Sequence, residues 1–386
     1  MADIKVSIAS PIIEDEEINA VIEVMKSGMI AQGPKVIEFE EKFAEYVGAK
    51  YGIATNSGTS ALHVALLAAG IGEGDEVITT PFTFAATGNS VLYTGAKPVF
   101  VDINPETFTI DPTKIEEAIT EKTKAIMPVQ LYGQSADMDA IMEIAKKHDL
   151  IVIEDAAHSF PSPTPLGYGG AIGDAGVFSF YVTKTITTAE GGMVCTRNPE
   201  LAKRMTTMRM HGMDRTTWDR YTSPRASWEY DIVAPGYKFN LPDVLAALGC
   251  CQLDRAQLFY EQRKKVAMKY NEAFSKLDFI QLPPDGQGNS WHLYLMRIIP
   301  EKLTISREEF AKKMQAAGLG ISVHFIPIFH FTYWKELYPD FTAQNFPNAE
   351  RQYNQTISIP LYPDMTEEQA DYVIKTVIEI GNANKI

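Results

Sequence analysis

Cysteine is scarce in this sequence, and its scarcity argues against two classes of protein. Only three cysteines occur in 386 residues, namely Cys195, Cys250 and Cys251. Two of them are neighbours in the chain, and neighbours cannot easily bridge each other or supply a spaced metal site. We therefore interpret all three as buried or incidental thiols and expect neither a disulfide framework nor a metal centre.

Long apolar runs and an excess of basic residues are also lacking. No stretch approaches the roughly 20 apolar residues that span a bilayer. The first residues, Met-Ala-Asp-Ile-Lys-Val-Ser-Ile, do not have the basic and apolar regions of a signal peptide. The formal net charge of −14 argues against nucleic acid or an anionic membrane as partner, because both are bound through Lys and Arg. We expect a cytoplasmic protein; an anionic small ligand needs only a local cluster of donors.

The sequence is rich in short apolar runs, and its 45% hydrophobic content can bury a full-sized core. From about Tyr51 onward these runs alternate with helical patterns, which is typical of an α/β domain with a mostly parallel sheet. We predict strands at 52–55, 76–79, 98–101, 125–129, 150–154, 176–180 and 193–196. Helices are predicted between them, among others at 60–69, 115–119 and 138–147.

A helical pattern over 242–274 precedes a turn-rich segment at 283–288, which we interpret as a domain boundary. The predicted domains are a large α/β domain, 1–282, which includes the long helix, and a small α+β domain, 289–386. In the small domain we expect a helix at 307–317 and strands at 292–298 and 321–327. Thr366 and Gln369 form the capping-box pattern of a last helix that continues to residue 378.

Two candidate ligand-binding segments follow predicted strands. Gly58, Thr59 and Ser60 start a predicted helix, where free N–H groups and small side chains can bind a phosphate, although an ordinary helix cap has the same pattern. Asp155 follows the apolar run Ile151-Val152-Ile153-Glu154. Because α/β proteins bind ligands at the carboxyl ends of strands, we expect Asp155 to face a crevice. A helix cap or surface turn is the alternative for Asp155.

Lys184 lies among small hydroxyl residues between two predicted strands, in Thr183-Lys184-Thr185-Ile186-Thr187-Thr188. A single lysine is usually solvated, but the flanking strands and the Glu190-Gly191-Gly192 turn indicate a confined loop. Burial and nearby cations lower the pKa of a lysine in such a loop and make a Schiff base with a carbonyl group accessible.

A phosphate site, a carboxylate at a strand end and a later lysine are the parts that pyridoxal 5′-phosphate (PLP) requires. The carboxylate keeps the pyridine nitrogen protonated, while the lysine holds the aldehyde and moves protons. Phe84 lies just past another strand end and is a candidate to stack on the ring. The alternative for Phe84 is a core aromatic.

With these residues in this order, the sequence resembles the DegT/DnrJ/StrS aminotransferases, sugar-modifying members of the fold-type I PLP enzymes. The resemblance extends from Ala31-Gln32-Gly33-Pro34 to Ile357-Ser358-Ile359-Pro360-Leu361-Tyr362-Pro363. It implies that Lys184 binds the cofactor covalently, that Asp155 faces the pyridine nitrogen and that His158 lies beside the phenolic oxygen. It also implies the stacking ring and the phosphate contacts, which fall on Phe84, Thr59, Ser60 and Ser179.

The resemblance further implies a homodimer with shared active sites. Asn240, in Gly236-Tyr237-Lys238-Phe239-Asn240, is similar to an asparagine that reaches the cofactor phosphate of a neighbouring subunit. The alternative is that Asn240 caps the helix expected near Pro242.

The activity that the resemblance implies is transfer of an amino group from L-glutamate to a nucleotide-linked keto sugar. Glutamate leaves as 2-oxoglutarate, and the cofactor alternates between PLP and pyridoxamine 5′-phosphate (PMP). The segments 236–240 and 324–327 are more similar to members that act at sugar C4 than at C3. The alternatives are a sugar dehydratase of the same fold, which commonly carries histidine in place of the lysine, and a regulator that only senses a ligand. Lys184 argues against the dehydratase, and the presence of Lys184, Asp155 and His158 together argues against the regulator.

Three positions depart from the family pattern. Ala189 replaces a glycine before Glu190-Gly191-Gly192, a substitution that is strained if the backbone there has positive φ. The proline-rich segment 160–165 replaces a Leu-Gly-Ala segment, and Phe329 replaces a common histidine. We expect these changes to affect the choice of substrate more than the cofactor chemistry.

Overall fold

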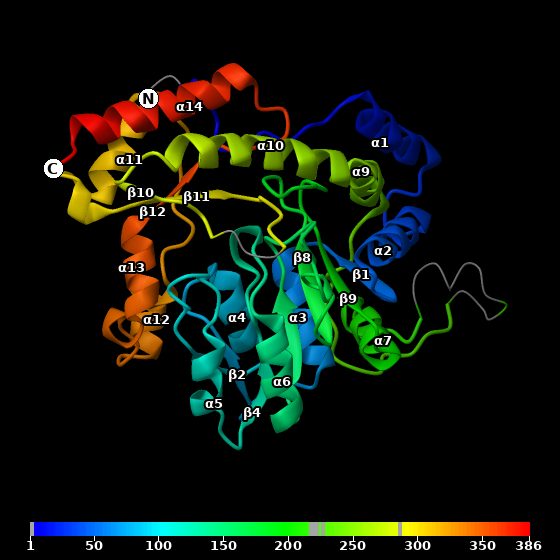
Figure 1. Ribbon diagram of the computed structural model, residues 1–386. Coiled ribbons are helices and arrows are strands. Elements are labelled where there is room, and N and C mark those ends of the chain that lie inside the picture. Colours follow the sequence, from blue (N-terminus) through cyan, green and yellow to red (C-terminus); the bar gives the residue numbers. More distant parts are fainter. Residues whose placement is uncertain (1–3, 216–223, 225–227, 285–287) are drawn as a thin grey trace.

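The computed structural model describes residues 4–215, 224, 228–284 and 288–386. Its centre is a seven-stranded sheet with the order β1-β9-β8-β5-β4-β2-β3 (Figure 1). β9 runs antiparallel to both of its neighbours, and the other neighbouring pairs are parallel. The predicted mostly parallel α/β sheet is therefore confirmed. The strands are β1 (Tyr51–Thr55), β2 (Glu76–Thr79), β3 (Lys97–Phe100), β4 (Thr123–Ile126), β5 (Ile151–Asp155), β8 (Ala175–Ser179) and β9 (Gly192–Thr196).

Helices cover both faces of the sheet. Because successive strand residues point to opposite faces, neighbouring residues of one strand pack against different helices. On β5, Val152 packs in one layer with α6 (Met138–His148), and Ile153 packs in the other layer with α3 (Gly58–Ala68) and α7 (Pro199–Met208). On β8, Phe178 packs with α2 (Pro34–Val47) and α9 (Asp243–Asp254). Both faces are thus buried, which leaves the strand ends for a ligand. Among the helices of the described residues, none is long and apolar enough to cross a membrane.

The pattern over 242–274 is not one continuous helix, contrary to the sequence prediction. It forms α9 and α10 (Ala256–Phe274), which are separated at Arg255 (φ −99°, ψ 0°). The Arg255 guanidinium pairs with Glu14 (2.9 Å) and Glu17 (3.1 Å) at the start of α1 (Asp15–Ser27). Glu17 is 238 residues away in the sequence, so the local apolar periodicity does not reveal this break.

The C-terminal part contains a three-stranded antiparallel sheet with the order β10-β11-β12. Helices α10, α11 and α14 pack with this sheet around a second hydrophobic cluster, at the top of Figure 1. The predicted capping box of Thr366 and Gln369 starts α14. The division into 1–282 and 289–386 stays a prediction, because its boundary at 283–288 lies partly outside the described residues. The elements are β10 (Ile280–Gln281), β11 (Tyr294–Ile298), α11 (Arg307–Ala316), α12 (Thr332–Leu337), α13 (Pro347–Gln355), β12 (Thr356–Ile359) and α14 (Glu367–Ala383).

The strand predicted at 321–327 is wrong. Ser322 alone pairs there, in an isolated bridge with Ser358 on β12. After Ser322, the ring of His324 bonds to the Ser358 hydroxyl (2.8 Å) instead of continuing the ladder. Pro327 has no N–H to donate to a neighbouring strand. The segment therefore leaves the sheet, and His324 and Phe325 contribute to the wall of a cavity.

Candidate active site

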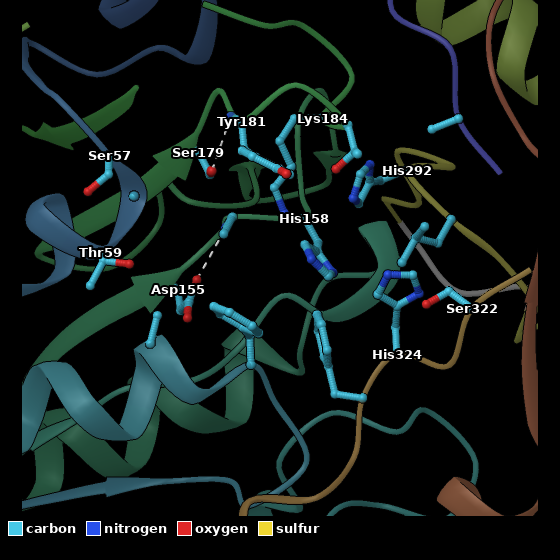
Figure 2. A pocket seen from close by; sticks show the side chains of 18 of the residues that line it. Ser57, Thr59, Asp155, His158, Ser179, Tyr181, Lys184, His292, Ser322 and His324 are labelled. Atoms are coloured by element: carbon cyan, nitrogen blue, oxygen red, sulfur yellow. Dashed lines mark hydrogen bonds between the residues drawn. The ribbon is translucent and has the colours of Figure 1, made fainter. Parts of the chain in front are cut away.

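A cavity of about 560 Å³ lies where β5 and β8 end, and it brings together most residues that the sequence singled out (Figure 2). Figure 2 shows Ser57, Thr59 and Ser179 on one side of this cavity, and three histidines together with Ser322 on the other. Ser60 and Asn240 are not among the lining residues. The other seven predicted site residues line the cavity, namely Gly58, Thr59, Phe84, Asp155, His158, Ser179 and Lys184.

The start of α3 builds the hydroxyl side of the cavity. Ser57 caps this helix, since its Oγ accepts from the Ser60 N–H (3.1 Å). Gly58 permits close packing, because a Cβ at this position would lie 3.0 Å from the Cβ of Ser179. The Ser60 hydroxyl donates to Asn56 Oδ1 (2.7 Å) and is thus engaged away from the cavity lining. N–H groups in the first turn of a helix have no intrahelical acceptor, so this corner can receive an anion.

Asp155 is the last residue of β5 and is 5% exposed. Its Oδ2 accepts from the Thr87 hydroxyl (2.7 Å), and its Oδ1 accepts from the Ala157 N–H (3.2 Å). Burial raises the pKa of the carboxyl group above its usual range, while both hydrogen bonds and the charge of Lys184 oppose this rise. Asp155 is therefore a buried carboxylate at the cavity and not a surface turn.

Lys184 lies in the loop between β8 and β9, and its side chain reaches the same cavity. The loop turns tightly here, because the Lys184 N–H donates to the Tyr181 carbonyl (2.8 Å). Burial lowers the pKa of the amine from 10.5 to about 8, although the charge of Asp155 opposes this shift. With this pKa, about a tenth of the amine is neutral at pH 7, which gives the lysine a nucleophilic form.

Three histidines form the other side of the cavity, of which the sequence identified only His158 as a site residue. The His158 ring centroid lies 4.7 Å from that of His292 and 6.5 Å from that of His324. Burial, together with the charge of Lys184, lowers the pKa of all three imidazoles, to about 4 for His324. The three rings are therefore neutral near pH 7. His292 gave no signal, because it lies at the start of a predicted strand.

Phe84 and Thr87 come from the start of α4 (Ala85–Tyr93), after β2. Phe84 occupies the N-cap position and is 59% exposed, so it is not a core aromatic. Its ring centroid lies 5.7 Å from that of Phe325, which also lines the cavity. Thr87, the hydrogen-bond partner of Asp155, was missed by the sequence analysis. No local pattern revealed its role, because Asp155 lies 68 residues further along the chain.

Asn240 lies outside the cavity of its own chain. It forms an isolated bridge with Thr55 at the end of β1, and the neighbouring Phe239 carbonyl accepts from the Asn56 N–H (2.7 Å). The N-cap of α9 is Pro242, and no side chain caps this helix. The alternative role of Asn240 as a helix cap is therefore wrong, and Asn240 lies beside the segment that leads into α3.

None of the three departures from the family pattern lines the cavity. Phe329 is 1% exposed and stacks on Phe346, with ring centroids 5.7 Å apart. The segment 160–165 contributes β6 (Pro163–Thr164), which pairs with β7 (Gly167–Tyr168). Ala189 has φ of 65°, which is the strained case for a residue other than glycine. None of these residues therefore contacts the cavity directly, and the expected effect on substrate choice is not supported by such a contact.

An anion site, a buried carboxylate and a lysine amine of lowered pKa share this cavity. A phosphorylated aldehyde with a basic ring nitrogen matches them group by group. The phosphate suits the N–H groups and hydroxyls, the ring nitrogen suits the carboxylate, and the aldehyde suits the amine. The exposed ring of Phe84 is available to cover a flat heterocycle. The residues that line the cavity therefore fit PLP.

Known proteins share both the sequence and the fold of this chain. Residues 11–378 match the DegT/DnrJ/EryC1/StrS aminotransferase family. The spore coat polysaccharide biosynthesis protein SpsC of Bacillus subtilis is 44% identical over 373 residues, which cover 96% of this chain and 95% of SpsC. Spr1654 of Streptococcus pneumoniae, assigned as a sugar aminotransferase and solved in its PMP form, has a TM-score of 0.92 and 32% identity, covering 98% and 100% of the two chains.

A second solved structure is PseC of Helicobacter pylori, an aminotransferase involved in the biosynthesis of pseudoaminic acid. Its TM-score is 0.90 at 30% identity, covering 98% of this chain and 99% of PseC. Spr1654 has been solved with PLP as well as with PMP. The match over nearly the whole chain and the fit of the cavity to the cofactor lead to one conclusion. The chain is a fold-type I, PLP-dependent enzyme that belongs to the DegT/DnrJ/EryC1/StrS aminotransferase family.

Proposed function

We propose that the protein transfers the amino group of L-glutamate to the ketone of a nucleotide-linked sugar. The product is an amino sugar for a surface polysaccharide or for secondary metabolism. The observation that carries the proposal is that Lys184, Asp155 and the start of α3 share one cavity in a chain of an aminotransferase family. A sugar substrate is supported by SpsC and PseC, which are described by their parts in the biosynthesis of a spore coat polysaccharide and of pseudoaminic acid.

Several side chains hold the cofactor in this proposal. Asp155 keeps the proton on the pyridine nitrogen, His158 lies beside the phenolic oxygen, and Phe84 covers the ring. The bound cofactor supplies an electron sink for the carbon that loses a proton. The phosphate is held at the start of α3 and at the end of β8, by Gly58, Thr59 and Ser179. Ser60, also predicted to contact the phosphate, instead bonds to Asn56 and does not line the cavity.

Lys184 performs the proton transfers of both half-reactions. Its neutral amine takes a proton from the α-carbon of glutamate, and its charged form later gives a proton to the sugar carbon that receives the nitrogen. Burial lowers the pKa of this amine to about 8, so both forms are accessible near neutral pH. Because burial also lowers the pKa of His158, its imidazole stays neutral and does not repel the charged amine.

The amine acceptor in this proposal is a ketone at sugar C4. The segments 236–240 and 324–327 support this position by their similarity to family members that act there. His324 and Phe325 line the cavity, so this motif can contact a sugar. The position of the new amine in the purified product, determined by NMR, tests the choice between C4 and C3.

The active unit in this proposal is a homodimer with shared sites, in which Asn240 donates to the cofactor phosphate of the partner subunit. Two observations support it. Asn240 is outside the cavity of its own chain, and it pairs with Thr55 just before the start of α3.

The first experiment is the half-reaction with glutamate. The PLP form, mixed with L-glutamate, should lose its visible absorbance and release one 2-oxoglutarate per active site. Lys184→Ala should show no such conversion. A protein that binds PLP and never converts it would be a sensor, and the proposal would then be wrong.

The second experiment screens keto sugar nucleotides against the purified PMP form. One of them should restore the PLP spectrum and yield an amino sugar. This product should carry one new amine in place of the ketone and as many hydroxyl groups as the substrate. A product that lost a hydroxyl and gained no nitrogen would identify the dehydratase instead.

A further inference from the structure

Two threonines and Asp155 form a buried row of hydrogen bonds beside the cavity. The Thr87 Oγ1 donates to Asp155 Oδ2 over 2.7 Å. The Oγ1 atoms of Thr83 and Thr87 are also 2.7 Å apart. The exposed fractions are 2% for Thr83, 0% for Thr87 and 5% for Asp155. The row is therefore shielded from water, where hydrogen bonds to a charged group have their largest effect.

The direction of both hydrogen bonds follows from the chemistry of the groups. An ionised carboxylate only accepts, and a threonine hydroxyl has a single hydrogen. Because Thr87 uses its hydrogen for Asp155, the hydrogen between the two threonines belongs to Thr83. Thr83 therefore donates to Thr87, and Thr87 donates to Asp155. The first hydrogen bond polarises the Thr87 hydroxyl and strengthens its bond to the carboxylate.

We propose that Thr83 and Thr87 are positioning residues that hold the Asp155 carboxylate in place and keep it negatively charged toward the pyridine nitrogen. This inference rests on the role of Asp155 in the proposed function. The Ala157 N–H binds Oδ1, so each carboxylate oxygen has one donor from the chain and retains capacity for the cofactor. Burial raises the pKa of Asp155, and the bond from Thr87 opposes this effect.

Helix α4 joins the row to the cavity and to the C-terminal part of the chain. Thr87 lies three residues after Phe84, so one helix start supplies both the ring that faces the cavity and the hydroxyl that holds Asp155. The next residue, Gly88, packs against Trp334 of α12, since a Cβ on Gly88 would come within 2.9 Å of the indole. Phe84, and not Thr83, is the N-cap of α4. Capping of α4 therefore does not explain why the Thr83 hydroxyl lies beside Thr87.

The test compares Thr87→Val, which keeps the shape and removes the hydroxyl, with Thr87→Ser, which keeps the hydroxyl. Thr83→Val removes only the second donor. Thr376→Val is the matched control, because the buried Thr376 hydroxyl donates to the Tyr372 carbonyl (2.8 Å) in α14. The readouts are the ¹⁵N chemical shift of ring-labelled PLP in the holoenzyme and the rate of the glutamate half-reaction.

We expect Thr87→Val to move the ¹⁵N resonance toward the unprotonated position and to slow the half-reaction by about 10- to 100-fold. Thr83→Val should have the same effects at about 3- to 10-fold. Thr87→Ser and Thr376→Val should stay within about threefold of the wild type. An unchanged ¹⁵N resonance in both valine variants of the row, or equal losses in Thr87→Ser and Thr87→Val, would overturn the inference.

Two further outcomes are informative. If Thr87→Val does not fold, Thr83→Val decides the question, because it leaves the bond between Thr87 and Asp155 intact. If the wild type does not react with glutamate while the ¹⁵N resonance still follows the threonine variants, the proposed function fails and the positioning role stands.

Discussion

Asp155 and Lys184 reach the same cavity from two adjacent strands of the sheet. Asp155 is the last residue of β5, and Lys184 lies five residues after the end of β8 at Ser179. β5 and β8 are paired in parallel, with Asp155 opposite Val177. This register places the Asp155 carboxylate near the lysine. Burial lowers the pKa of the Lys184 amine to about 8, and the charge of Asp155 limits this fall.

The first prediction concerns the pH dependence of cofactor capture. The pKa of Lys184 is about 8 in the folded protein, below the usual value for lysine. The neutral amine is the form that attacks the aldehyde, so its fraction falls about tenfold for each pH unit below 8. We expect the rate of covalent PLP capture by the apoprotein to rise from pH 6 to 8 and then to level off. Stopped-flow absorbance measures this rate.

Borohydride reduction and peptide mapping should then place the cofactor on Lys184, and Lys184→Ala should remain unlabelled. Label on another lysine, or a capture rate that rises steadily to pH 10, would show that a different amine or an unshifted one is responsible.

Much of the fold and part of the site could be predicted from the sequence, because both depend on local patterns. Apolar runs identified the strands of the large sheet, and Asp155 and Lys184 follow such runs closely. Thr87 could not be found in this way, because its partner lies 68 residues away. The break at Arg255 depends on Glu14 and Glu17 in another helix. Such contacts require the tertiary structure.

Ala189 gives a second prediction, which concerns stability. Its φ of 65° costs about 1–2 kcal/mol for a residue with a Cβ, whereas glycine adopts this conformation freely. Ala189→Gly also makes the unfolded chain more flexible, which costs about 0.5–1 kcal/mol. We expect a net gain of up to about 1.5 kcal/mol, measured as a higher midpoint of urea unfolding.

Ala20 in the interior of α1 is the control for this substitution. Ala20→Gly should lower stability by about 1 kcal/mol, because glycine is unfavourable inside a helix. If both glycine variants lost stability equally, the backbone at Ala189 would carry no strain.

Phe84 gives a third prediction, which concerns cofactor affinity. Its ring is 59% exposed at the cavity, and stacking of aromatic rings contributes about 0.5–1.5 kcal/mol. Phe84→Ala should therefore weaken PLP binding by about 2- to 12-fold, while Phe84→Tyr should bind as the wild type does. Titration of the apoprotein with PLP measures the Kd. Phe331, which is 38% exposed outside the cavity, is the matched position. An equal loss in Phe331→Ala would contradict stacking by Phe84.

Asp155 gives a fourth prediction. Asp155→Asn should keep the fold and bind PLP, but lose about 100-fold or more of the glutamate half-reaction, because an amide does not supply the negative charge that keeps the pyridine nitrogen protonated. Asp174→Asn is the control, since Asp174 accepts from the Val152 N–H (2.8 Å) and does not line the cavity. This variant should react at nearly the wild-type rate. Near-normal turnover of Asp155→Asn with cofactor bound would assign another role to Asp155.

The last prediction concerns the sharing of sites between subunits. Asn240 does not line the cavity of its own chain, and in the proposed dimer it donates to the phosphate in the partner subunit. Lys184→Ala should be inactive, and Asn240→Ala should be weakened by about tenfold through loss of one hydrogen bond to a charged group. In a mixed dimer of these variants, one site loses both groups and the other retains both.

Mixing the two variants in equal amounts, with subunit exchange, should therefore make about a quarter of all sites intact. The activity of the mixture should then rise above that of the Asn240→Ala parent alone. If Asn240 acted in its own subunit, every site in a mixed dimer would lack one group, and no rise would occur. Exchange must be verified independently, for example by mass spectrometry of differently tagged subunits. A mixture that exchanges subunits and never exceeds the Asn240→Ala parent would rule out the shared site.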